Sequence, residues 1–312
     1  MKDKIFKENV SLKEFTTYEI GGVAKYFFIA KNKEDLILAI KKAKEFKLPI
    51  FILGGGSNVL FSDDGFAGLV IKIKILDIKF KKNTAFVGAG VGLTKLGNLV
   101  AKKGFAGLEW AVGIPGTVGG AIFGHAQAFG EKISDVVKSV EVLDLNTLSV
   151  KNFSKEQCRF SLKNSIFKKN KNLVIISAIL EFPKKNPDEI KKTIEKNINY
   201  RKNNHPMNFP SAGSTFVNPE TVIKDKKLLK KFPELAEYNK KGTIPAGYLI
   251  SRCGLQGKII SKAQISGKHA NFIINLGGAK AKDVLALIDL VKKEVKKTFG
   301  IDLVPEVQVI RF

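Results

Sequence analysis

The sequence predicts an α+β protein of about two domains. At 312 residues the chain is long enough for each domain to bury its own core. In residues 1–75, a strand-like segment, a helical pattern and two further strand-like segments follow one another, an order that suits a small α+β lobe. Near the other end, a long helical pattern over residues 281–299 lies between strand-like residues 270–276 and 303–310.

The first elements follow from apolar spacing and one capping residue. Residues 26–30 are typical of a strand, and Asn32 is suited to cap the helix that follows. The apolar residues of that helix recur at helical spacing, at Leu36, Ile37, Ile40, Ala43 and Phe46. The apolar run 48–53 and residues 69–73 indicate two more strands.

The middle of the chain is expected to hold a helix over residues 93–103, which ends before Gly104, and strands over residues 137–145 and 173–182. A surface helix over residues 188–203 then leads to a domain boundary. Its expected buried face is formed by Ile190, Ile194 and Ile198.

Two glycine clusters are candidate phosphate-binding loops. Gly54, Gly55 and Gly56 follow the strand-like run 48–53, and three glycines in a row let successive backbone N–H groups converge on an anion. Taken alone, such a turn is equally well interpreted as a tight loop without a ligand. The pattern fits neither a Rossmann fingerprint nor a P-loop. A second cluster, residues 113–120, suggests that two loops hold one pyrophosphate from two sides.

The chain carries 53 Lys and Arg against 29 Asp and Glu, a net charge of +24. A basic surface attracts polyanions, and nucleic acid is one candidate. Lysine is spread along the whole chain, however, and most aromatic residues are Phe in apolar runs, which is typical of a core rather than of base-stacking platforms. The charge alone does not decide the function.

The sequence also bears on location and redox state. No segment approaches the roughly 18–20 apolar residues of a membrane helix. The N-terminal residues lack the apolar core of a signal peptide, so we expect a cytoplasmic protein. Cys158 and Cys253 are too few and too far apart for a disulfide framework, and no metal site is expected.

Several motifs over nearly the whole chain resemble one known family. They are FTTYEIGG (Phe15 to Gly22), GGGSN (Gly54 to Asn58), GIPGTVGG (Gly113 to Gly120), CRFSLKNSIFK (Cys158 to Lys168), PSAGSTFVNP (Pro210 to Pro219), PAGYLI (Pro245 to Ile250), KHANFIIN (Lys268 to Asn275) and VPEVQVI (Val304 to Ile310). In this order they resemble the UDP-N-acetylenolpyruvoylglucosamine reductases, flavoenzymes of peptidoglycan precursor synthesis. The chain is most similar to the shorter subgroup of that family.

The resemblance implies a fold in three parts. Residues 1–75 and 76–200 would be the two lobes of an FAD-binding domain of the vanillyl-alcohol-oxidase (PCMH) type. Residues 201–312 would be a smaller α+β substrate-binding domain, with a C-terminal strand at about 303–312 that returns to the first lobe. FAD is the implied cofactor, NADPH the hydride donor and a UDP-sugar enolpyruvyl ether the substrate. A monomer without a nucleic-acid or membrane partner is expected.

Three catalytic residues are carried over from the family. Ser214 matches the proton donor, which protonates the carbanion left after a hydride reaches the enolpyruvyl terminal carbon. Arg159 matches the arginine whose planar fork suits the substrate carboxylate and offsets enolate charge. Glu306 matches the third position, where burial in an apolar strand would raise a carboxyl pKa. A turn serine, a surface ion pair and a solvent-facing edge-strand glutamate are the structural alternatives.

Cofactor and substrate contacts are implied in the same way. The cofactor contacts are Gly54, Gly55, Gly56, Ser57, Asn58, Gly113, Ile114, Pro115, Gly116, Thr117, Gly119 and Gly120, with Gly21 and Gly22 as a third glycine element. The substrate or NADPH contacts are Asn218, Lys268 and His269.

The chain departs from the family at a few positions. His125 and Gln127 replace the first and last residues of an Asn-Ala-Gly core, Val217 replaces a basic residue, and His205 replaces a glutamine. A neutral loop histidine is the default interpretation of His125, and a covalent flavin link is the other. Two different functions stay open: another flavin oxidoreductase of the same superfamily, or a basic nucleic-acid-binding protein without catalysis.

Overall fold

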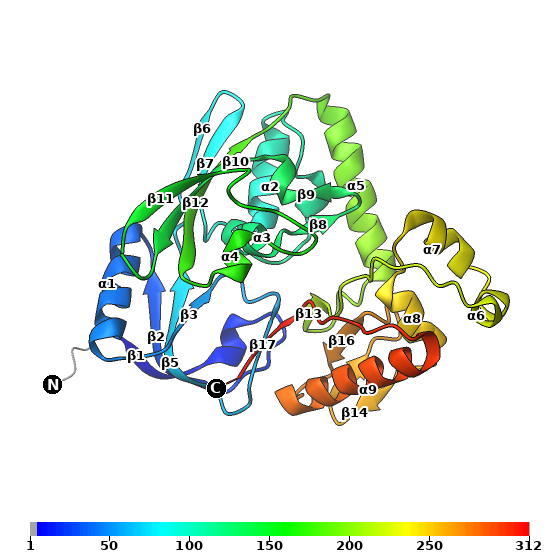
Figure 1. Cartoon of the computed structure of the whole chain (residues 1–312). Helices are drawn as coiled ribbons and strands as arrows, with labels where there is room; N and C mark the ends of the chain where they lie inside the picture. Colours follow the sequence, from blue (N-terminus) through cyan, green and yellow to red (C-terminus); the bar gives the residue numbers. More distant parts are fainter. Residues whose placement is uncertain (1–4, 312) are drawn as a thin grey trace. The chain divides into compact units, whose positions relative to one another are not determined.

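The computed structural model describes residues 5–311, which form two compact units (Figure 1). The first unit comprises the chain up to Val10, Ala24–Gly56 and Phe66–Asn203, and the second comprises Ser11–Val23, Ser57–Gly65 and the chain from Asn204 onward. Each unit has its own hydrophobic core. The division expected at residue 75 falls inside the first unit, because one core is shared by the elements on both sides of it.

The first sheet of the first unit has four strands around a parallel centre. Its order is β1 (Lys7–Ser11), β2 (Val23–Ala30), β5 (Phe66–Ile73) and β3 (Ile50–Leu53). Both β2 and β3 pair with β5 in parallel. Helix α1 (Lys33–Glu45) joins β2 to β3, and Asn32 caps it as predicted, because its Oδ1 accepts a hydrogen bond from the N–H of Asp35 at 2.7 Å.

The second sheet of the first unit is antiparallel throughout. Its order is β11 (Val150–Ser154), β10 (Val137–Asp144), β12 (Leu173–Glu181), β7 (Thr84–Gly88) and β6 (Ile78–Lys81). Helix α2 (Leu93–Lys102) follows β7, one residue shorter than predicted. The two long strands predicted from apolar runs are therefore confirmed, as β10 and β12.

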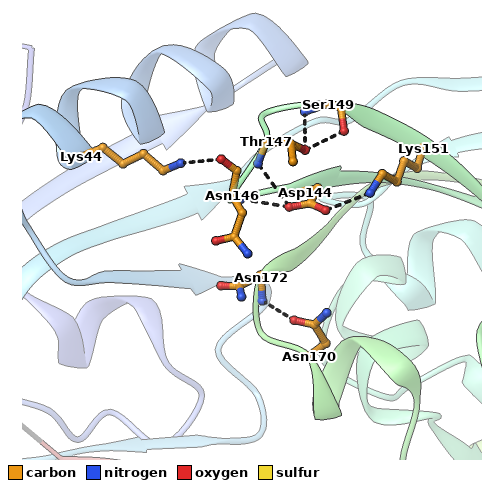
Figure 2. A network of polar contacts seen from close by, with 8 residues as sticks. All are labelled: Lys44, Asp144, Asn146, Thr147, Ser149, Lys151, Asn170 and Asn172. Atoms are coloured by element: carbon orange, nitrogen blue, oxygen red, sulfur yellow. Dashed lines mark hydrogen bonds and ion pairs between the residues drawn. The ribbon is translucent and has the colours of Figure 1, made fainter.

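A polar network fixes the turn between β10 and β11 (Figure 2). The carboxylate of Asp144 accepts hydrogen bonds from the N–H of Asn146 at 2.9 Å and from Nζ of Lys151 at 2.9 Å. Nζ of Lys44, in the last turn of α1, donates to the carbonyl of Asn146 at 3.1 Å. The bond to Lys151 contributes most to lowering the pKa of Asp144. The network thus joins the hairpin of the second sheet to the helix that covers the first.

The remaining elements of the first unit lie around this framework. They are α3 (Val118–Gly124), β8 (Gln127–Ala128), β9 (Glu131–Lys132), α4 (Ile166–Lys169) and α5 (Pro187–Asn204). The predicted buried face of α5 is only partly right. Ile190 is buried as expected, but Ile194 and Ile198 are half-buried, and the other fully buried positions are polar, Asn197 and Arg201.

The second unit contains an antiparallel sheet covered by helices. The strand order is β13 (Ser211–Ser214), β16 (Phe272–Asn275), β15 (Ala263–Ile265) and β14 (Ile259–Ile260). Helix α9 (Ala281–Phe299) has the predicted bounds and packs against β14 and β15. The shorter helices α6 (Lys226–Lys231), α7 (Leu235–Lys241) and α8 (Ala246–Arg252) were not predicted, because each is too short for a periodic pattern.

The C-terminal strand is shorter than its apolar pattern predicted. Only β17 (Gln308–Ile310) forms, and it pairs in parallel with β4 (Val59–Phe61). Upstream of it, Pro305 has no N–H to donate to a ladder, and the chain makes a single bridge to Phe216 there. Among residues 5–311, no helix is both long and apolar enough to cross a membrane.

One lysine of the first sheet makes the stability of the protein depend on pH. Burial, followed by the charge of Lys74, lowers the pKa of Lys72 in β5 to about 8. As the pH rises above about 8, the folded state releases this proton before the unfolded state does, so the free energy of unfolding should increase toward pH 10. Below pH 8 the ammonium is charged in both states and its desolvation opposes folding.

We therefore expect Lys72→Met to stabilise the protein at pH 7 and to flatten the rise in stability between pH 8 and 10. Urea unfolding followed by circular dichroism at pH 7, 8, 9 and 10 measures both effects. Lys41→Met, on the exposed side of α1, is the control and should change the free energy of unfolding by less than about 0.5 kcal/mol. An unchanged pH profile in the Lys72 variant would contradict this interpretation.

Candidate functional site

The two predicted glycine loops meet in the first unit. A Cβ built on Gly55 would lie 2.6 Å from Cα of Gly116, and one on Gly54 would lie 3.0 Å from Oγ1 of Thr117. Real Cβ atoms do not approach backbone atoms as closely as 2.6 Å, so the first loop needs glycine at residue 55, where it touches the second loop. The two main chains therefore lie against each other at Gly55 and Gly116, an arrangement that suits a pyrophosphate cradle.

Local structure explains how each loop reaches this point. Strand β3 ends at Leu53, so Gly54 is the first residue after it. The second loop turns at Gly113 and Gly116, whose φ angles are 85° and 129°. It is then tied to α2, because the N–H of Leu93 donates to the carbonyl of Gly116 at 3.0 Å.

Not every residue of the second glycine cluster faces the contact between the loops. Thr117 caps α3, its Oγ1 accepting from the N–H of Gly120 at 3.3 Å. Gly119 is buried, and a Cβ there would lie 2.8 Å from Cβ of Ala89. This glycine is needed for packing between α3 and the end of β7.

Sequence reasoning missed a buried arginine that supports the second loop. Arg201 of α5 is 4% exposed, and its guanidinium donates to the carbonyls of Trp110 at 2.6 Å and Val112 at 2.9 Å. The guanidinium also lies over the ring of Phe129, 4.8 Å from its centroid. These bonds fix the chain immediately before Gly113. The available signal was an arginine eleven residues after Ile190, on the same face of an amphipathic helix.

Ser57 and Asn58 belong to the second unit, where Asn58 holds the C-terminal segment. Its Nδ2 donates to the carbonyl of Glu306 at 3.2 Å, and its own carbonyl accepts from the N–H of Gln308 at 3.0 Å. Within residues 5–311 its Oδ1 is buried without a hydrogen-bond partner. A buried amide oxygen left in this way is costly unless a bound molecule supplies a donor.

Ser214 and Glu306 lie on adjacent segments of the second unit. The N–H of Glu306 donates to the carbonyl of Thr215 at 2.8 Å. One residue further on each side, Phe216 and Pro305 form an antiparallel bridge. The structure therefore brings together two of the three predicted catalytic residues, which are separated by about 90 positions in the sequence.

Both of these side chains are half-buried. The Ser214 hydroxyl has no hydrogen-bond partner among the residues that the structure describes, so its proton is not committed to the protein. Gly213, with a φ of 76°, and a register shift between Ser211 and Ser214 interrupt the ladder to β16 at this point. Such a bulge is a common way to aim a side chain out of a sheet.

Asn271 builds this part of the site and was not singled out from the sequence. It is 3% exposed, and its side-chain amide accepts from the N–H of Phe216 at 3.0 Å and donates to the carbonyl of Phe216 at 2.9 Å. Its backbone carbonyl accepts from the N–H of Thr215 at 2.7 Å. The signal was an asparagine between apolar residues, since a buried amide needs partners.

Arg159 lies in the first unit, on the loop between β11 and α4. Its side chain is exposed, and its backbone is left-handed with a φ of 46°. This conformation is rare for a residue other than glycine and costs on the order of 1–2 kcal/mol. Its neighbour Cys158 is fully buried, where desolvation raises the pKa of the thiol to about 12.

His125 is built into the protein rather than left available for a covalent bond. Its Nδ1 lies 2.5 Å from the carbonyl oxygen of Ser161, and its Nε2 lies 2.9 Å from Oγ of Ser134. Burial is the main cause that lowers the pKa of His125. With both ring nitrogens engaged, the alternative of a flavin link through His125 has no free atom to form it.

The three predicted substrate contacts lie in the second unit. Oδ1 of Asn218 accepts from the N–H of Ala246 at 2.9 Å at the start of α8, which leaves its Nδ2 for other contacts. His269 is half-buried, its ring centroids 5.3 Å from His205 and 5.0 Å from Phe272, and burial lowers its pKa. Lys268, beside it, is exposed.

Two protein families match separate parts of the chain. Residues 205–310 match the family described as UDP-N-acetylenolpyruvoylglucosamine reductase, C-terminal domain, and residues 24–150 match the FAD binding domain family. The predicted order of an FAD-binding domain and a mixed α and β substrate domain is thereby confirmed.

Full-length relatives extend the match to the whole chain. The UDP-N-acetylenolpyruvoylglucosamine reductase of Anoxybacillus flavithermus is 38% identical over 97% of this chain and 94% of its own length. That of Prochlorococcus marinus subsp. pastoris is 37% identical over 100% and 99%. The crystal structure of the Thermus caldophilus reductase superposes with a TM-score of 0.78 at 29% identity, covering 98% of this chain and 100% of that one. The chain belongs to the UDP-N-acetylenolpyruvoylglucosamine reductase family.

Proposed function

We propose that this protein reduces UDP-N-acetylenolpyruvoylglucosamine to UDP-N-acetylmuramate for peptidoglycan precursor synthesis, with bound FAD and with NADPH as the hydride donor. The family assignment supports the substrate class. The observation that carries the chemistry is the pairing of the Ser214 and Glu306 segments through the bond from Glu306 N–H to the Thr215 carbonyl. Through this bond the residues that carry the hydroxyl and the carboxyl lie on neighbouring segments of one unit.

The glycine loops of the first unit are proposed to hold the FAD pyrophosphate. Backbone atoms meet backbone atoms at the close contact between Gly55 and Gly116, and Oγ1 of Thr117 lies beside Gly54. Arg201 keeps the approach to Gly113 in place through the carbonyls of Trp110 and Val112. These loops would hold FAD, which would supply hydride transfer from NADPH to the terminal methylene carbon of the enolpyruvyl group.

Ser214 is proposed to deliver the proton that completes the reduction. Adding a hydride to the methylene carbon converts the double bond to a methyl group and leaves the electron pair on the carbon that carries the carboxylate. That carbanion is basic enough to take the proton of a serine hydroxyl, and the uncommitted hydroxyl of Ser214 suits this role. Positioned proton transfer typically contributes ~10²–10⁴-fold, or roughly 3–5 kcal/mol of barrier.

Arg159 and Glu306 are proposed to manage the charge of the same carbon and its carboxylate. A guanidinium binds a carboxylate with two parallel N–H donors and keeps its charge at every working pH, so Arg159 suits the enolate-like product of hydride addition. Glu306 is held at its backbone by Asn58 and by Thr215, which fixes its position beside Ser214. Asn218, Lys268 and His269 are proposed to contact the sugar nucleotide or NADPH.

The contact between the loops predicts that Gly55→Ala weakens FAD binding by at least about tenfold, equivalent to about 1.4 kcal/mol. The new methyl group must push the Gly116 backbone away and thereby separate the two loops. Titration of the flavin-free protein with FAD, followed by flavin fluorescence, measures the dissociation constant. Gly124→Ala, with open space around its Cβ, is the matched control. Unchanged FAD affinity in a folded Gly55 variant would refute the proposed pyrophosphate site.

Ser214→Ala separates the two halves of the reaction. Bleaching of the flavin absorbance by NADPH should proceed at the wild-type rate, because no proton from Ser214 is needed there. Recovery of the absorbance on adding the enolpyruvyl sugar nucleotide should slow by ~10²–10⁴-fold. Stopped-flow absorbance resolves both steps. Ser211→Ala, on the same strand, is the matched control and should leave both rates unchanged; equal rates in both variants would exclude Ser214 as the proton donor.

A further inference from the structure

We propose that His125 is a positioning residue for Arg159: its ring holds the loop of residues 158–165 in the conformation that presents the guanidinium to the substrate carboxylate. This inference rests on the role proposed above for Arg159. His125 itself touches neither the substrate nor the cofactor in the proposal. It acts through the backbone of Ser161 and the ring of Phe160, the two residues that follow Arg159.

The hydrogen bonds of His125 determine which ring nitrogen carries the proton. The carbonyl of Ser161, 2.5 Å from Nδ1, can only accept, so Nδ1 must be the donor. Nε2 is then the acceptor, and the hydroxyl of Ser134, 2.9 Å away, donates to it. The neutral ring therefore satisfies both partners at once. Burial favours this neutral form, since it lowers the pKa of His125.

Stacking adds a second contact to the same loop. The rings of His125 and Phe160 lie 4.8 Å apart at an interplanar angle of 30°. The ring of His125 thus stacks on the side chain of Phe160 and donates to the backbone of Ser161. Because Cys158 on the other side of Arg159 is fully buried, the arginine is held from both directions.

The loop needs such anchors because its backbone is strained at the arginine. The left-handed conformation of Arg159, with a φ of 46°, relaxes toward common backbone angles once its surroundings stop enforcing it. Lys163, later in the same loop, has a φ of 52°. Ser161 and Asn164 exchange two backbone hydrogen bonds of 3.0 Å, so the bend is closed locally. Two side chains tie this closed bend to other elements: His125, and Lys168 of α4, whose Nζ donates to the carbonyl of Lys163 at 2.9 Å.

The element to which His125 ties the bend is α3, the helix that follows the second glycine loop. His125 is its C-cap and is itself left-handed, with a φ of 47°. A second tie runs parallel to the first, since Oγ of Ser165 donates to the carbonyl of Phe123 at 2.7 Å. Helix α3 is therefore connected to both loops: Thr117 of the glycine loop caps its start, and His125 at its end holds the arginine loop.

The consequence is specific to the sugar nucleotide. Releasing the arginine loop misplaces a group that binds the substrate carboxylate, but it leaves the contact between Gly55 and Gly116 untouched. A misplacement of about 1 Å in a positioned group can lower a rate by up to ~10²-fold. The KM for the enolpyruvyl sugar nucleotide should rise and the second half-reaction should slow, while FAD binding and reduction by NADPH stay constant.

Three substitutions at residue 125 test the individual contacts. His125→Ala removes all of them, and His125→Asn keeps an N–H donor near the place of Nδ1. His125→Gln places its amide near Nε2, where it can reach Ser134 but not the Ser161 carbonyl. Ser134→Ala removes only the partner of Nε2. Each variant is purified with FAD, and flavin content, bleaching by NADPH and recovery with the sugar nucleotide are measured beside Arg159→Ala.

We expect His125→Ala and His125→Gln to raise KM for the sugar nucleotide by about tenfold or more, with the NADPH step within about twofold of wild type. His125→Asn should restore KM to near the wild-type value, and Ser134→Ala should change it little. Asn also tolerates the left-handed backbone of residue 125 better than Gln does, so the readout that separates a positioning role from a merely structural one is the unchanged FAD content and NADPH step beside the raised KM. Equal loss of FAD affinity and substrate affinity in His125→Ala, or failure of the Asn variant to rescue, overturns the inference.

The failure of the proposed function has a different signature. If wild-type protein does not oxidise NADPH in the presence of the enolpyruvyl sugar nucleotide, the proposed reaction is wrong. If wild type is active but Arg159→Ala leaves the second half-reaction intact, the role of Arg159 is wrong and the positioning role of His125 falls with it. If Arg159→Ala collapses that step and His125→Ala does not, only the inference about His125 fails.

Discussion

The approach of two backbones at Gly55 and Gly116 is the constraint on which the first unit depends. A Cβ at residue 55 would lie 2.6 Å from the facing Cα, so the loops can touch only because neither carries a side chain there. Each loop is held by a regular element. Strand β3 ends directly before Gly54, and the N–H of Leu93 at the start of α2 donates to the carbonyl of Gly116. The strand and the helix thus position two irregular segments so that they touch.

In the second unit, hydrogen bonds between short or irregular segments position the residues of the candidate site. Thr215 lies between Asn271 and Glu306: its N–H donates to the carbonyl of Asn271, and its carbonyl accepts from the N–H of Glu306. Each of these bonds is worth only about 1 kcal/mol, but together they determine which residues become neighbours. Ser214 gains its place next to the C-terminal segment through this arrangement and not through a long strand, since β13 has only four residues.

Regular elements were predictable wherever the information is local. The cap at Asn32 and the bounds of α9 follow from a few neighbouring residues, and both were right. Pro305 could have predicted that the C-terminal strand begins late, because proline has no N–H for a ladder. The apolar residues around it predicted a longer strand instead. The helix face of Arg201 was readable from its spacing to Ile190, but its partners were not, because the carbonyls of Trp110 and Val112 lie about 90 residues away in the sequence. The catalytic candidates came from motif resemblance, and periodicity alone would not have selected them.

The residues that hold the proposed catalytic side chains share one device. His125, Asn271 and Asn58 each use a side chain to bind the backbone of a distant segment. A backbone carbonyl is present whatever residue carries it, so the held segment can vary in sequence while the holder must keep a donor at one point. For the loop of Arg159 that requirement is an N–H at the place of Nδ1. Histidine and asparagine side chains both have such an N–H. The other ring nitrogen of His125, Nε2, needs a hydrogen-bond donor, and the hydroxyl of Ser134 supplies it in this chain.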